Sequence, residues 1–280
     1  MRTLECKKIT AVVSELCKEA CTNLGKDVVN ALQRATETEI SSSGQDILKI
    51  LLDNANVAKA ENIPMCQDTG FTVVFLELGQ QVLITGGELT EAINAGVRKG
   101  YSEGYLRKSI VGHPLNRTNT GDNTPCVIHT KIVPGDKLKI TVAPKGGGSE
   151  NMSTLKMLKP ADGIEGVIKF VLDTVKAAGP NPCPPIVVGV GIGGTMEKAA
   201  IMAKEALLRE IGSSNPDPDL AELEKELFTK INQLGIGPQG LGGSTTALAV
   251  HVKAFAAHIA SLPVAVNLNC HAARHKSVIL

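Results

Sequence analysis

Three cysteines that could do chemistry lie in breaks between the predicted helices and strands. Cys66, Cys183 and Cys270 occur in the segments PMCQD, NPCPP and LNCHA, beside prolines, glycines or polar residues. The prolines around Cys183 remove backbone N–H groups and stiffen the chain. Such a segment suits a thiolate held at a fixed point, and it equally suits a plain structural turn.

The spacing of these cysteines restricts the metal sites that they could form. They are 117 residues (66 to 183) and 87 residues (183 to 270) apart, and the sequence has no C-x-x-C pair. A zinc finger or a ferredoxin-type site is therefore excluded. If three cysteines hold a four-iron cluster, the fourth iron is open and can act as a Lewis acid on a hydroxyl and a carboxylate. Ordinary buried thiols are the alternative.

The other four cysteines are typical of a protein core. Cys6, Cys17 and Cys21 lie on predicted helices, and Cys126 opens a predicted strand among apolar neighbours. The total of seven cysteines is odd and scattered over a long chain. This pattern argues against a disulfide framework.

Bulk composition excludes several classes of partner. Lys+Arg is 29 and Asp+Glu is 28, so the formal net charge of +1 gives no general attraction to nucleic acid or to an anionic membrane. Trp 0, Tyr 2 and Phe 5 are too few aromatics for stacking on single-stranded bases. No apolar run approaches the ~20 residues of a membrane helix, and the N-terminus has no secretory signal. We therefore expect a cytoplasmic protein.

The elements that must position the cysteines form a mixed α/β (α+β) pattern. Residues 1–60 are expected to be mostly helical, and residues 61–280 to form a mixed sheet with surrounding helices. Helices and strands alternate without a regular βαβ order, so a doubly wound sheet fits less well. We expect residues 1–280 to form a single domain.

Some local assignments are specific enough to check. The segment 71–79 is β-branched and aromatic, which predicts a strand. The segments 126–133 and 137–144 also predict strands, which we expect to pair as a hairpin around Pro134-Gly135. The segments 186–192, 247–255 and 262–269 predict further strands.

Two glycine-rich motifs resemble nucleotide-binding loops, but each lacks a feature that nucleotide binding requires. GVGIGG follows a predicted strand and opens a helix, yet no second strand with an acidic end follows about 20 residues on. The alternative is a glycine-rich turn for close packing. GPQGLGGS has Gly243 where a phosphate loop needs its lysine, which argues against a Walker-type NTPase.

Several segments carry a family resemblance when they are read together. They are PMCQDTG, NTGDNTPCVIH, PKGGGSEN, NPCPPIVVGVGIGGT, GIGPQGLGGSTTALAV and NCHAARH. In this order they resemble the N-terminal part of the class I, iron–sulfur fumarate hydratases and of the related L(+)-tartrate dehydratases, over roughly residues 5–280. Many family members are one longer chain. The resemblance therefore implies the two-subunit form, with this chain as the α subunit of a hetero-oligomer and a separate β subunit.

The resemblance also implies a cofactor and its ligands. Cys66, Cys183 and Cys270 match the cysteines that ligate a 4Fe–4S cluster in the family. The physical reasoning agrees, because an open iron can neutralise the hydroxide that departs in a dehydration.

Residues for a small dicarboxylate substrate are implied as well. Gln67 and Asp68 follow the first ligand, Arg107 in YLRKS resembles the carboxylate-binding arginine, and Gly147 or Gly148 in KGGGSEN would offer an N–H. A dicarboxylate needs such cationic and N–H donors.

The catalytic base is left unassigned between candidates. Asp68 and His258 are the candidates in this chain, and the β subunit is the other source in the family. His258, within FAAHIASL, resembles a family active-site histidine and could equally be a core histidine. His129 and His251 fall within predicted strands, and we interpret both as structural.

Two polar segments remain to be placed. TGDNTP is polar enough to contact substrate, and it could equally cap a helix or shape the floor of the site. RHKS, near the end of the sequence, is interpreted as a solvated basic face.

The resemblance predicts a hydro-lyase that converts fumarate to (S)-malate reversibly. The close alternative is L(+)-tartrate dehydratase, which forms oxaloacetate, and one substrate hydroxyl separates the two. A more distant alternative is a non-catalytic iron–sulfur scaffold or sensor, which would need no dicarboxylate-binding groups.

Overall fold

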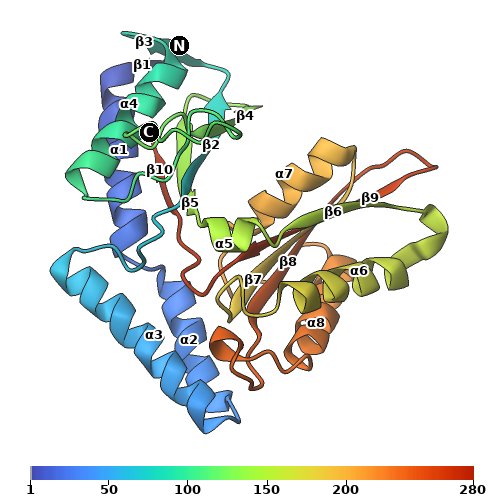
Figure 1. The fold of residues 1–280 in the computed structure, drawn as a ribbon. Helices are drawn as coiled ribbons and strands as arrows, with labels where there is room; N and C mark the ends of the chain where they lie inside the picture. Colours follow the sequence, from blue (N-terminus) through green and yellow to red (C-terminus); the bar gives the residue numbers. More distant parts are fainter. Residues whose placement is uncertain (1) are drawn as a thin grey trace. The chain divides into compact units, whose positions relative to one another are not determined.

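The computed structural model describes residues 2–280, and the chain divides into two compact units (Figure 1). Unit 1 contains the described residues up to Leu24, with Ala55–Gly147 and Arg274–Leu280. Unit 2 contains Gly25–Asn54 and Gly148–Ala273. Two compact units can belong to one domain, so the expectation of a single domain over residues 1–280 stays a prediction.

Unit 1 is built on a four-stranded mixed sheet in the order β10–β5–β2–β4. Strand β2 pairs parallel with β4 and antiparallel with β5, and β10 pairs antiparallel with β5. Strands β1 and β3 form a separate parallel pair. The elements are β1 (Arg2–Glu5), α1 (Cys6–Thr22), β2 (Phe71–Gly79), β3 (Val82–Thr85), α4 (Leu89–Glu103), β4 (Val127–Val133), β5 (Leu138–Lys145) and β10 (Lys276–Ile279).

The hairpin predicted around Pro134-Gly135 is wrong, although both of its strands form. Strand β2 lies between β4 and β5 and pairs with each of them. The turn after β2 takes the hydrogen bonds at this end, because Gln80 N donates to Val133 O and Gln81 N to Gly135 O, each at 2.9 Å. The turn residues therefore predicted the turn between β4 and β5 correctly, but these two strands do not pair with each other.

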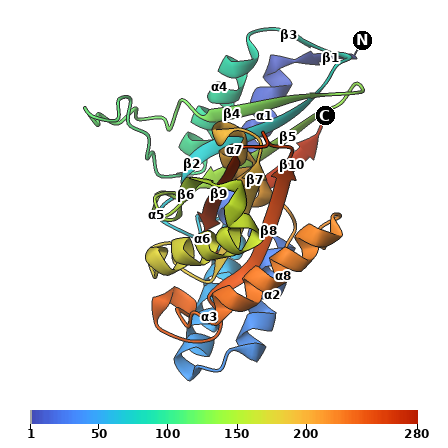
Figure 2. The same cartoon turned by 90° about the vertical axis from the view of Figure 1, so that its right-hand side faces the viewer.

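The core of unit 1 lies between one face of this sheet and helices α1 and α4 (Figures 1 and 2). Helix α1 presents Ile9, Val13 and Leu16 at helical spacing, and all three are buried. Helix α4 approaches α1 closely, since a Cβ at Gly96 would lie 2.7 Å from Thr10 O. The buried sheet face comes from alternate positions of two strands, namely Val74, Leu76, Ile140 and Val142.

Unit 2 is built on a second four-stranded mixed sheet in the order β6–β9–β7–β8. Strand β7 pairs parallel with β8 and antiparallel with β9. The elements are α2 (Lys26–Thr38), β6 (Thr154–Leu158), α6 (Gly163–Ala178), β7 (Ile186–Gly193), α7 (Met196–Ala206), α8 (Pro218–Asn232), β8 (Ala247–Phe255) and β9 (Leu262–Asn269). Two of the four boundaries between the units fall inside α3 (Ser42–Glu61) and α5 (Gly147–Glu150), and the other two fall after Leu24 and after Ala273.

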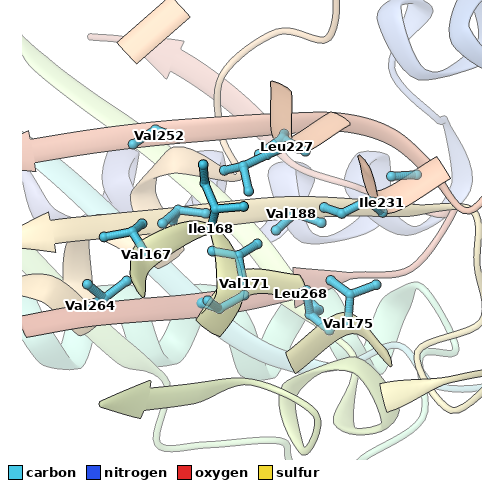
Figure 3. Close-up of a cluster of buried hydrophobic side chains, with 14 of the residues drawn as sticks. Val167, Ile168, Val171, Val175, Val188, Leu227, Ile231, Val252, Val264 and Leu268 are labelled. Carbon is cyan, nitrogen blue, oxygen red and sulfur yellow. The ribbon is translucent and has the colours of Figure 1, made fainter. Parts of the chain in front are cut away.

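The two faces of this sheet carry different side chains. Helices α6 and α8 cover one face, where Val264, Val266 and Leu268 of β9 join the main core (Figure 3). Helix α7 covers the other face, where Ala265 packs against Ala199 and Ala203. The alternation along β9 follows the period of two that a strand imposes.

GVGIGG serves close packing, as its alternative interpretation predicts. A Cβ at Gly189 or Gly191 of β7 would lie 2.1 Å from a backbone oxygen of α7. Only glycine therefore lets α7 approach the strand this closely. The next strand, β8, pairs parallel with β7 but begins only at Ala247, after a second helix, α8. The motif therefore lacks the strand with an acidic end about 20 residues on that a dinucleotide fold needs.

The mixed α/β class and the helical N-terminal segment are confirmed. Ser41 Oγ accepts from Gly44 N at 3.2 Å, so Ser41 caps the start of α3. In residues 2–280, every helix is too short or too polar to cross a membrane.

Candidate active site

The turn after Cys66 is folded around the Asp68 carboxylate. Asp68 Oδ1 accepts from Gly70 N at 3.0 Å, which closes an Asx turn. Asp68 Oδ2 accepts from Gly147 N at 2.8 Å, in the segment that follows β5. Two groups that the sequence assigns to substrate binding are thus brought together in unit 1.

Buried polar groups fix the far end of this turn. The Tyr101 hydroxyl, fully buried, donates to Thr69 O at 2.7 Å and contacts Gly70 O at 3.1 Å. Gly70 has φ +83°, and a Cβ there would lie 2.8 Å from Lys145 N, so this position requires glycine. Thr69 Oγ1 donates to Arg107 O at 2.9 Å. The segment that carries Arg107 is therefore attached to the Cys66 turn.

Asn123, in TGDNTP, links the turn after Cys66 to the segment that carries Arg107. Asn123 is fully buried, accepts from Ser109 N at 2.7 Å and donates to Gly70 O at 3.2 Å. Burial acts to raise the pKa of the neighbouring Asp122, but hydrogen bonds, with Arg98 as the main donor, lower it to about 2. Asp122 thus stays ionised and holds the segment beside α4.

Arg274 is a site residue that the sequence analysis missed. It is buried, and its guanidinium donates to Asp68 O and to Pro144 O. The interpretation of RHKS as a solvated basic face is therefore wrong at this position. No local pattern could show it, because the carbonyls that Arg274 binds lie more than a hundred residues earlier in the sequence.

The side chains of Gln67 and Arg107 are exposed beside this turn. Cys66 is partly exposed next to them, whereas Cys17 and Cys21 of α1 are buried. Burial raises the pKa of the Cys21 thiol to about 11 and that of Cys126 to about 11 as well. Cys21 and Cys126 are therefore thiols, and the burial of Cys6, Cys17 and Cys21 agrees with the prediction that they are core residues.

Cys183 and Cys270 lie on adjoining loops of unit 2. Cys183 has φ +54°, a left-handed conformation that is uncommon for a non-glycine residue. Its carbonyl accepts from the backbone N–H of His271 at 3.3 Å, and His271 Nδ1 lies 3.1 Å from the same oxygen. Two of the three predicted ligands are thus at the same end of the β7–β9 pair, before β7 begins and after β9 ends.

His258 lies at the opposite end of the same sheet. It is exposed in the turn between β8 and β9, where its Nδ1 accepts from Ala260 N at 3.1 Å. The end of β8 pairs with Gly193, the last residue of β7, while Cys183 precedes the first. Eight residues of strand separate these ends, about 25 Å. Unit 2 therefore does not bring His258 to Cys183 and Cys270, and the core interpretation of His258 is wrong.

The donor set fits an iron–sulfur cluster in chemistry. Cys66, Cys183 and Cys270 are at least partly exposed, and thiolates are the ligands that such clusters prefer. Over residues 2–280, no three His, Cys, Asp or Glu side chains gather as a metal-binding group. The chemistry of these side chains thus fits an iron–sulfur cluster. The binding of one cluster by all three cysteines stays a prediction.

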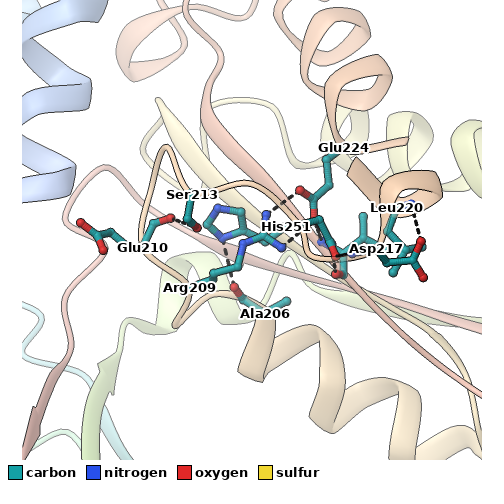
Figure 4. Close-up of polar contacts among 10 residues, drawn as sticks. Ala206, Arg209, Glu210, Ser213, Asp217, Leu220, Glu224 and His251 are labelled. Carbon is teal, nitrogen blue, oxygen red and sulfur yellow. Dashed lines mark hydrogen bonds and ion pairs between the residues drawn. The ribbon is translucent and has the colours of Figure 1, made fainter. Parts of the chain in front are cut away.

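His251 and its neighbours form a structural network in unit 2 (Figure 4). His251 is buried, and its Nδ1 lies 3.1 Å from Ala206 O. Burial, with the positive charge of Arg209, lowers the pKa of His251 to about 4. Arg209 binds Glu224 through two hydrogen bonds of 2.8 and 2.5 Å. His129 stacks on Phe75 with ring centroids 5.0 Å apart, so the structural interpretation of both histidines holds.

Comparison with known proteins places this arrangement in a family. The profile of the fumarate hydratase (fumerase) family matches residues 10–279. The chain belongs to this family. Membership makes it a hydro-lyase, a kind of carbon–oxygen lyase, as the sequence resemblance predicts.

Relatives of the chain carry the name of another hydro-lyase. The "Putative L(+)-tartrate dehydratase subunit alpha" of Methanocaldococcus jannaschii is 48% identical over 273 residues, 95% of each chain. The L(+)-tartrate dehydratase subunit alpha of Escherichia coli O157:H7 is 36% identical over 277 residues, 98% of this chain and 91% of the relative. That of Escherichia coli strain UTI89 is 37% identical over 271 residues, 95% and 89% of the two chains.

Proposed function

We propose that the chain is the α subunit of an iron–sulfur-dependent hydro-lyase that hydrates fumarate reversibly to (S)-malate. The family match over residues 10–279 carries the proposal. A second candidate is L(+)-tartrate dehydratase, which the names of the relatives favour. (S)-Malate and L-tartrate differ by one hydroxyl, and both are dicarboxylates that need the same pair of carboxylate-binding groups.

Cys66, Cys183 and Cys270 would hold a 4Fe–4S cluster in this enzyme. Their partial or full exposure supports this role, in contrast to the burial of the cysteines of α1. When bound, the cluster would supply a Lewis acid for the hydroxide that leaves or adds. A sensor that carried the same cluster would not need the donors that surround Cys66.

Those donors are groups of this chain. Arg107 is exposed and can grip one carboxylate through two parallel N–H bonds. Gly147 N–H already binds a carboxylate, that of Asp68, which supports its use for a substrate carboxylate. Gly148 is the next N–H of the segment, and the Gln67 amide is exposed to reach a substrate.

Asp68 is the candidate of this chain for moving a proton at the neighbouring carbon. Its carboxylate is partly exposed and lies one residue from the exposed Gln67. His258 is left out of the set around Cys183 and Cys270, because it lies at the other end of the β7–β9 pair. A β subunit, which the names of the relatives as α subunits support, would supply the remaining groups.

Turnover assays test this proposal. The chain, co-expressed anaerobically with its β subunit, would be assayed with fumarate and with L-tartrate side by side. Formation of (S)-malate from fumarate is the expected result, and oxaloacetate from tartrate alone would establish the second candidate. Turnover of neither substrate by a preparation that contains the cluster would contradict both.

A further inference from the structure

The glycine-rich segment 235–243, which fails as a phosphate loop, lies against the loop that carries Cys183. Gln239, in its middle, has φ +53°, so a non-glycine residue is held in a left-handed conformation. Its backbone N–H donates to Pro184 O at 2.7 Å, and its side-chain Nε2 donates to the same oxygen at 2.8 Å. One carbonyl next to Cys183 thus receives two bonds from one residue.

The Gln239 side chain also contacts the loop that carries Cys270. Its Nε2 lies 3.2 Å from Nδ1 of His271, the residue after Cys270. His271 in turn contacts Cys183 O through its backbone N–H. Gln239 Nε2 therefore stands between the residue that follows Cys183 and the residue that follows Cys270.

The segment packs tightly on the start of the Cys183 loop as well. A Cβ at Gly240 would lie 2.3 Å from Pro180 Cβ, so the backbone approaches Pro180 more closely than any other residue allows. Cys183 N donates to Pro180 O at 2.9 Å. The glycine-rich segment thus touches both ends of the turn Pro180–Pro184.

A carboxylate anchors the other end of the segment. Glu39 is buried, and its two oxygens accept from Ser41 N at 3.0 Å, Ser244 N at 2.8 Å and Thr245 N at 2.7 Å. Burial acts to raise the pKa of Glu39, but these hydrogen bonds lower it. Glu39 therefore occupies the amides just after the segment, while the amides of Gly240, Leu241 and Gly242 donate to carbonyls within it, and the segment serves as a support.

We propose that Gln239 is a positioning residue, whose amide N–H groups fix the Cys183 loop relative to the Cys270 loop. The inference rests on the proposed function only for the assignment of Cys183 and Cys270 as cluster ligands. The contacts themselves lie within unit 2 and involve no cluster, substrate or partner.

Hydrogen–deuterium exchange of the full chain, under reducing conditions and without cluster, tests the inference. Gln239→Glu keeps the shape of the side chain and removes its donors, whereas Gln239→Gly removes the side chain and tolerates φ +53°. Gln233→Glu is the matched control, because Gln233 is exposed at the end of α8. Exchange would be followed in peptides that contain Cys183, Cys270 and Cys66.

Both Gln239 variants should exchange about two- to tenfold faster in the Cys183 and Cys270 peptides, the effect of losing one or two neutral hydrogen bonds. The Cys66 peptide and the Gln233→Glu chain should match the wild type. Wild-type exchange in Gln239→Glu, or equal acceleration in the Cys66 peptide, would overturn the inference. Because no cluster or turnover is measured, either result is independent of whether the proposed function is correct.

Discussion

Asp68 Oδ2 lies 2.8 Å from the backbone nitrogen of Gly147, so two groups assigned to substrate binding bind each other in the free chain. Asp68 Oδ1 also holds Gly70 N at 3.0 Å. A substrate carboxylate that takes the Gly147 N–H must therefore displace Asp68 from it. That exchange would leave the Asp68 oxygen available beside the bound substrate.

Removing the Asp68 carboxylate should loosen the turn that it organises. We expect Asp68→Ala to lower the free energy of unfolding by about 2 kcal/mol, because two backbone N–H groups lose a charged acceptor. Urea denaturation measures this loss. Asp217→Asn is the control, since asparagine replaces aspartate well at the start of α8. An Asp68→Ala chain as stable as the wild type would show that the turn needs no carboxylate.

Arg274 should stabilise the same turn from the opposite side. Arg274→Met keeps most of the apolar stem and leaves the carbonyls of Asp68 and Pro144 without this donor. A loss of about 3 kcal/mol is expected, since unsatisfied buried acceptors are costly. Thermal or urea unfolding would measure it. Arg2→Met serves for comparison, because Arg2 also binds a carbonyl but is exposed, and it should change stability by less than about 0.5 kcal/mol.

Acid should destabilise the chain through His251. Its pKa is about 4 in the folded chain, mainly because it is buried, and about 6.5 when unfolded. The unfolded state therefore binds the proton more readily, and stability falls as pH falls from about 6.5 to 4. The total loss should be about 3 kcal/mol. His251→Gln removes this titration, so its unfolding free energy should depend less on pH in that range, and an unchanged slope would refute the assignment.

Periodicity in the sequence predicted most elements because it reports local burial. The strands 71–79, 247–255 and 262–269 formed with the expected bounds. Periodicity does not predict which strands pair with each other. The sequence between β4 and β5 contains good turn residues, yet β2, from earlier in the chain, inserts between them. Turn chemistry acts over four residues and cannot report a strand that arrives from elsewhere.

The candidate site shows the same limit. Asp68 and Gly147 were predicted from their motifs, and the structure joins them. Arg274 and Gln239 were missed, because each acts on a carbonyl that is distant in sequence and carries no side-chain signal. His258 was predicted from its resemblance to a family active-site histidine, and in unit 2 it lies at the other end of β9 from Cys270.

The central claim is that Cys66, Cys183 and Cys270 together ligate a cluster. Anaerobic reconstitution with iron and sulfide, followed by iron content and visible absorbance, tests it directly. The wild-type chain should take up about four irons, and serine at any of the three positions should abolish the absorbance. Cys126→Ser is the control, since that thiol is also partly buried and should not be needed. A wild-type chain without cluster absorbance, or three serine variants that retain it, would contradict the claim.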